Sequence, residues 1–97
     1  MITFEELRTK YKPQILDLAE KYGITDIRVF GSVARGDARE DSDIDFLVSR
    51  IKGGDAWGIG GFYFEASKLL GHNVDVTTEG GLSSYIKDNI LREARSL

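Results

Sequence analysis

The stretch GSVARGDAREDSDID, residues 31–45, decides how the rest of this sequence is interpreted. It begins with Gly31-Ser32 directly after an apolar segment and ends with Asp43-Ile44-Asp45. Alternate side chains of a β-strand share a face, so Asp43 and Asp45 point to the same side, about 7 Å apart along the strand, and Ile44 and Phe46 point to the other side. Two anionic groups on one face repel each other, and such a pair needs either a cation or a proton on one carboxylate.

Length and composition limit what the chain can be. Its 97 residues are enough for one small domain, residues 1–97, and too few for two. A net charge of −3 without a long basic block argues against broad electrostatic binding to nucleic acid. The chain has no cysteine, which excludes disulfides and thiolate zinc sites. It shows no signal peptide and no apolar run long enough to span a bilayer, so we expect a cytoplasmic protein without membrane contact.

The pattern of apolar residues predicts an α/β (α+β) fold, with a small sheet and helices packed on it. Residues 3–22 carry an apolar stripe at helical spacing and begin with a Thr3–Glu6 capping box, while Pro13 predicts either one kinked helix or two short ones. Asp55 is a candidate cap for a later helix that Gly71 ends. The remaining expected elements are strands at 26–30, 42–49 and 73–77, a turn at 79–81, and a final helix at 82–95.

A third carboxylate lies on the last predicted strand. Asp75 stands between Val74 and Val76, so it faces away from the side on which its apolar neighbours are buried. If this strand pairs beside the second one, Asp75 joins Asp43 and Asp45. Carboxylates suit magnesium, and three of them can hold two ions about 3.5–4 Å apart for in-line displacement at phosphorus. The alternative is that all three aspartates are solvated surface groups.

The Gly-Ser turn is a candidate phosphate site. Gly31 allows close approach of the backbone to a ligand, Ser32 adds a hydroxyl donor, and Arg35 adds a charge-assisted contact. Most Gly-Ser pairs are simple turns, and this pair gains weight because ten residues separate it from the paired aspartates on the next strand. A phosphate cradle beside a metal site would hold a metal-bound nucleoside triphosphate.

These motifs resemble the signature of the DNA polymerase β-like nucleotidyltransferase superfamily. The string GSVARGDAREDSDIDFLV is similar to that of its minimal nucleotidyltransferase (MNT) branch. LLGHNVDV, with Asp75, resembles the segment that supplies the third carboxylate, and KDNILREARSL is similar to the ending of that family. The resemblance covers nearly the whole chain.

The resemblance implies a mixed sheet flanked by helices and a full set of site residues. Asp43, Asp45 and Asp75 would be catalytic and bind two Mg²⁺ ions, whereas Gly31 and Ser32 would bind the triphosphate. The reaction would transfer AMP from ATP to a hydroxyl and release pyrophosphate. Many stand-alone MNT proteins are antitoxins that adenylylate a tyrosine of a HEPN-domain ribonuclease toxin. We therefore expect a HEPN partner in a hetero-oligomer, since another chain must bring the acceptor.

Two other functions stay open at this point. The protein could be an antitoxin that silences its partner by masking it, through exposed aromatic residues such as Trp57, Tyr63 or Tyr85. It could also be a nucleotidyltransferase for a small molecule or an RNA end, which would act without a protein partner. Masking should survive loss of Asp43 and Asp45, whereas enzymatic neutralisation should not.

Overall fold

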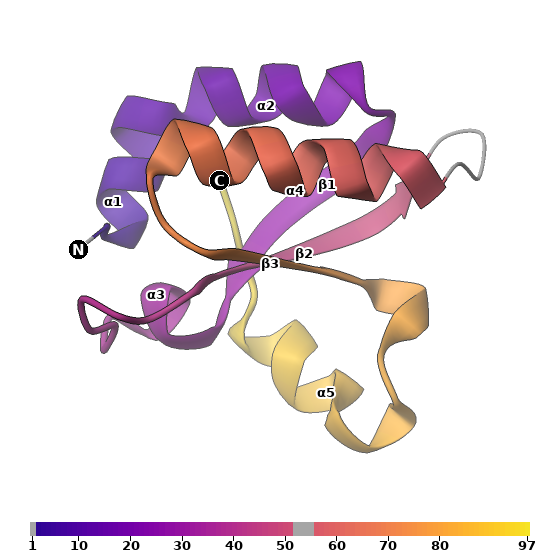
Figure 1. The fold of residues 1–97 in the computed structure, drawn as a ribbon. Coiled ribbons are helices and arrows are strands. Elements are labelled where there is room, and N and C mark those ends of the chain that lie inside the picture. Colours follow the sequence, from indigo (N-terminus) through magenta and orange to yellow (C-terminus); the bar gives the residue numbers. More distant parts are fainter. Residues whose placement is uncertain (1, 52–55) are drawn as a thin grey trace.

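A four-stranded mixed sheet organises the protein (Figure 1). The computed structural model describes residues 2–51 and 56–97. The strand order is β3-β2-β1-β4. β2 runs antiparallel to β1 and parallel to β3, and β4 adds to β1 in the antiparallel sense. The strands are β1 (Ile24–Phe30), β2 (Ile44–Ile51), β3 (Val74–Thr78) and β4 (Arg95–Ser96).

Helices α2 and α4 lie side by side over one face of the sheet (Figure 1). The predicted first helix is one continuous helical run with an irregular middle. It comprises α1 (Phe4–Glu6), a π-helical segment η1 (Leu7–Tyr11) and α2 (Lys12–Lys21). The Thr3–Glu6 capping box is present, as predicted. Pro13 lies in the first turn of α2, where its missing N–H costs little, so the chain accommodates it by a local change of helix type.

The core lies between the sheet and these two helices. Ile44, Phe46 and Val48 alternate along β2 and are 0–1% exposed, which confirms the face predicted from their spacing. Phe62 of α4 (Ala56–Leu70) packs edge-on against Phe46, with ring centroids 5.8 Å apart. Burying these side chains and their neighbours supplies most of the favourable free energy of folding. One face of β2 is therefore committed to the core, and its other face is left for the aspartates.

The opposite face carries the short helix α3 (Gly31–Arg35), the 3-10 turn η2 (Glu79–Gly81) and α5 (Ser84–Glu93). The final helix was predicted to run over 82–95, but it ends at Glu93 because residues 95–96 pair with β1. None of the residues of α5 is buried, so this helix adds no fully buried side chain to the core. The proposed cap Asp55 lies outside the described residues. No helix in the described part of the chain is long and apolar enough to cross a membrane.

Candidate active site

The pairing of β2 with β3 brings two of the predicted carboxylates together. The parallel register places Asp45 directly opposite Asp75. Their neighbours Ile44 and Val74 are buried on the α2/α4 side, so both aspartates point to the open face. Asp43 lies just before β2, where its charge acts on Asp45, and is exposed, like Asp75, whereas Asp45 is half-buried. The pairing of the second and third strands, on which the predicted three-aspartate site depends, is therefore present.

Asp45 has an unusual electrostatic environment. Burial, followed by the charges of Asp75, Asp43 and Glu93, raises the pKa of Asp45 to about 6, while Arg35 acts in the opposite direction. A raised pKa means that the folded protein disfavours the ionised form of this carboxyl group. A cation beside Asp45 would stabilise the ionised carboxylate, and a raised pKa is expected of a carboxyl group that binds a cation.

Gly31 brings the backbone of α3 against Asp45. Its φ of +76° is in the left-handed region, and a Cβ at this position would overlap Asp45 Oδ2. Only glycine meets both conditions without strain. The Gly-Ser pair is thus more than a turn, because it sets the start of α3 directly beside the central carboxylate. Ser32 follows on the first turn of α3, half-buried, and its carbonyl oxygen accepts the Gly36 and Asp37 N–H groups.

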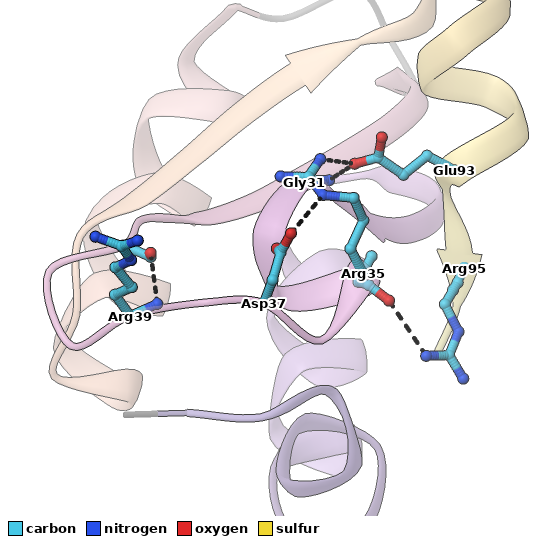
Figure 2. A network of polar contacts seen from close by, with 8 residues as sticks. Gly31, Arg35, Asp37, Arg39, Glu93 and Arg95 are labelled. Atoms are coloured by element: carbon cyan, nitrogen blue, oxygen red, sulfur yellow. Dashed lines mark hydrogen bonds and ion pairs between the residues drawn. The ribbon is translucent and has the colours of Figure 1, made fainter.

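A carboxylate that sequence reasoning missed contacts α3 at the site (Figure 2). Glu93, at the end of α5, accepts hydrogen bonds at Oε1 from the Gly31 N–H (2.5 Å) and from Arg35 Nη1 (2.7 Å). Arg35 also contacts Asp37, with 3.2 Å between Nε and Oδ2. Hydrogen bonding to Asp37 and the charge of Glu93 raise the pKa of Arg35. No local pattern marks Glu93, since it lies 62 residues beyond Gly31 in the chain.

The sheet surface beyond the carboxylates is closed. Leu47, on the same face of β2 as Asp45, is 0% exposed. Its partner in the register, Arg28 of β1, forms an ion pair with Glu79 of η2. Arg28, for which the sequence suggested no role, therefore ties the turn after β3 to the sheet.

The site offers carboxylate ligands for a hard cation, but it does not provide a complete coordination shell. Carboxylate oxygens are the ligands that Mg²⁺ takes. Among residues 2–51 and 56–97, no three His, Cys, Asp or Glu side chains converge into a group that could hold a metal ion. Mg²⁺ is usually bound by one or two carboxylates, with water and phosphate oxygens as the other ligands. The adjacent Asp45 and Asp75 thus fit a cation that arrives with its nucleotide.

A surface cavity of about 500 Å³ adjoins Asp43, but neither Asp45 nor Asp75 lines it. Asp43 lines it together with Tyr63, Lys68 and His72. Tyr63 is 47% exposed, which confirms the expectation that this aromatic residue faces solvent. A larger cavity, of about 770 Å³, lies between α2 and α4 and contains none of the predicted site residues.

Residues 12–97 match the model of the nucleotidyltransferase domain family. The chain belongs to this family. A solved structure described as a minimal nucleotidyltransferase is 40% identical, covers 99% of this chain and 97% of its own, and superposes with a TM-score of 0.85. The mixed sheet and its helices are thus those of a minimal nucleotidyltransferase, which confirms the predicted family and fold.

Two further similar proteins are a protein adenylyltransferase and an MNT antitoxin. The protein adenylyltransferase MntA of Thermococcus cleftensis is 38% identical over 99 residues, which span 96% of this chain and 94% of that protein. A solved complex of a tri-AMPylated HEPN toxin with an MNT antitoxin, from Shewanella oneidensis, shares the fold with a TM-score of 0.64 at 17% identity. It covers 88% of this chain and 66% of the solved one.

Proposed function

We propose that this nucleotidyltransferase is a protein adenylyltransferase that moves AMP from ATP to a hydroxyl, a tyrosine hydroxyl in our assignment, of a HEPN toxin and thereby acts as its antitoxin. The observation that carries the proposal is the meeting of Gly31, Asp45 and Asp75 at one point of the open sheet face. The 38% identity to MntA over nearly the full length of both chains supports the protein substrate.

The carboxylates and the residues of α3 have different proposed roles. We assign Asp43, Asp45 and Asp75 to the binding of Mg²⁺, which when bound would lower the pKa of the acceptor hydroxyl and neutralise charge on the leaving pyrophosphate. Gly31, Ser32 and Arg35 are assigned to the triphosphate. The exposed Asp75 lies beside Asp45 on the edge strand β3, where an incoming hydroxyl can reach it, and we assign it to orienting that hydroxyl.

The reaction asks little covalent chemistry of the protein. The acceptor oxygen forms a bond to the α-phosphorus, the bond from that phosphorus to the β-phosphate bridging oxygen breaks, and pyrophosphate leaves. Positioning and charge stabilisation dominate such transfers. The half-buried Asp45 provides a partly dehydrated carboxylate at the centre of the site, where electrostatic interactions are stronger than in bulk water.

Which phosphate of ATP is transferred to the partner tests the proposal. The chain would be incubated with Mg²⁺, a catalytically silenced HEPN partner, and ATP labelled in either the α- or the γ-phosphate. We expect label on the partner only from α-labelled ATP, and none with Asp75→Asn. Label from γ-labelled ATP would identify a kinase instead. Label on RNA or on a small molecule in the absence of the HEPN partner would show that the acceptor is not a protein.

A binding antitoxin is the second candidate function. The observation in its favour is the exposure of large apolar side chains: Tyr85 is 94% exposed and Phe64 is 59% exposed. Such residues are common anchors in protein interfaces. If Asp43→Asn/Asp45→Asn still silences the toxin at equal concentration, masking is the function and transfer is secondary.

A further inference from the structure

The hydrogen bonds of Glu93 stand out among the contacts of the site. One carboxylate oxygen, Glu93 Oε1, accepts both the Gly31 N–H and the Arg35 guanidinium, at 2.5 Å and 2.7 Å (Figure 2). A phosphate oxygen is bound in proteins by the same pair of groups, a backbone N–H and an arginine. In shape and charge, Glu93 therefore resembles a bound phosphate oxygen.

These donors are the ones that the proposed function assigns to the triphosphate. While Glu93 holds them, neither the Gly31 N–H nor Arg35 Nη1 is available to a nucleotide. The charge of Glu93 also contributes to raising the pKa of Asp45, so this carboxylate lies close enough to repel an incoming polyanion. Bound nucleotide and Glu93 in its present position are mutually unfavourable.

The helix that carries Glu93 is only lightly attached to the body of the protein. No residue of α5 is buried, and Ile86 is 46% exposed. The chain after α5 is anchored separately, because Arg95 Nη1 donates to the Ala34 carbonyl and the Arg95 guanidinium lies 3.9 Å from the centre of the Phe4 ring. Moving α5 would expose no fully buried side chain of its own, so the Glu93 contacts contribute to holding it beside α3.

We infer that Glu93 is an internal stand-in for the triphosphate, which holds Gly31 and Arg35 in the nucleotide-free protein and is displaced when nucleotide binds. The inference rests on the proposed function, in that Gly31 and Arg35 receive the triphosphate there. Displacement frees α5 from α3, so nucleotide occupancy is coupled to the position of the helix that exposes Tyr85 and Ile86. The apparent affinity for nucleotide is reduced by the fraction of molecules in which Glu93 occupies the cradle.

Two isosteric variants on the same helix test this competition. Glu93→Gln removes the charge from the cradle, while Asp88→Asn removes the same charge from an exposed position of α5, so both change the net charge equally. The dissociation constant of Mg²⁺ with a non-hydrolysable ATP analogue would be measured by calorimetry for each. We expect Glu93→Gln to bind about fivefold more tightly than wild type, because a neutral acceptor holds its donors less strongly than a carboxylate does. Asp88→Asn should bind like wild type.

Hydrogen exchange of the α5 amides gives a second measurement. In the wild type, exchange should accelerate when the analogue binds, whereas in Glu93→Gln it should already be fast without nucleotide. Equal or weaker nucleotide binding by Glu93→Gln would overturn the inference and make Glu93 a fixed support of the cradle. If neither wild type nor Glu93→Gln binds the analogue, the proposed function fails together with the inference. Equal binding by both leaves the proposed function standing and removes only the competition.

Discussion

At the scale of single residues, the site depends on the close approach of Gly31 to Asp45. A backbone with φ of +76° and a carboxylate in the space that a Cβ would fill leave room for glycine alone. Gly36 offers a matched control, because its φ of +86° is also left-handed but nothing lies within 4 Å of its would-be Cβ.

We predict that Gly31→Ala abolishes nucleotidyl transfer, whereas Gly36→Ala retains most of it. Both variants should lose about 1–2 kcal/mol of unfolding free energy through backbone strain, with a further loss for Gly31→Ala because Asp45 must move. Chemical denaturation and transfer rates on the same preparations measure the two effects. Equal activity of the two variants would show that the approach of Gly31 to Asp45 is irrelevant to the reaction.

Asp45 also predicts a dependence of stability on pH. Its pKa rises from 3.8 in the unfolded chain to about 6 in the folded one, so the folded state binds more protons between these values. Below pH 4 the carboxyl group is protonated in both states, and the free energy of unfolding has its full value. As the pH rises through 6, the free energy of unfolding falls, because the folded state disfavours the ionised carboxylate. At pH 7.5, Asp45→Asn should therefore have an unfolding free energy roughly 1 kcal/mol above that of wild type, after allowance for solvent screening, and a Tm about 4–8 °C higher. At pH 4 the two proteins should unfold at nearly the same temperature. A thermal scan showing a lower Tm for Asp45→Asn at pH 7.5 would contradict this account of Asp45.

At the scale of elements, the sequence predicted what depends on local periodicity. The alternation along 42–49 correctly separated Ile44 and Phe46 from the aspartates, and the Val-Asp-Val pattern placed Asp75 on the right face. β4 was missed because two residues, Arg95 and Ser96, carry no period-two signal.

Contacts between distant elements could not be predicted in this way. Glu93 was missed because its partners are 58 and 62 residues away in the chain, and no spacing rule reaches across that separation. That no residue of α5 is fully buried is likewise a consequence of where the helix lies and not of its sequence. The assignment of Asp43, Asp45 and Asp75 to Mg²⁺ remains a proposal, although Asp45 and Asp75 lie side by side, as expected if the second and third strands pair.

The two glycines in the middle of α4 give a prediction for that helix. Gly60 is exposed with nothing within 4 Å of its would-be Cβ, whereas a Cβ on Gly61 would overlap the Tyr22 ring. Gly60→Ala should raise the unfolding free energy by about 0.5–1 kcal/mol, because alanine loses less backbone entropy in a helix. Gly61→Ala should lower it by about 1–3 kcal/mol, since Tyr22 must leave both its place between α2 and α4 and its hydrogen bond to Glu65. Thermal unfolding of the pair checks both signs, and two changes of the same sign would contradict the packing of α4 on α2.

At the scale of the whole molecule, the two faces of the sheet are covered to different extents. Helices α2 and α4 cover one side of the sheet (Figure 1). Asp45 and the exposed Asp75 lie side by side on the other. An open carboxylate cluster suits an acceptor that is itself a protein, because a large substrate can bring its own surface to exclude water from the reacting atoms.

The central claim is that Asp43 and Asp45 serve the transfer of AMP to a partner toxin. Its most direct test is the intact mass of the HEPN toxin, taken as the protein encoded beside this one, after co-expression with wild type or with Asp43→Asn/Asp45→Asn. Circular dichroism of the double variant would verify that its fold is retained. We expect a mass gain of one or more AMP groups on the toxin with the wild type and none with the double variant. An unmodified toxin that both proteins bind and silence equally would contradict it.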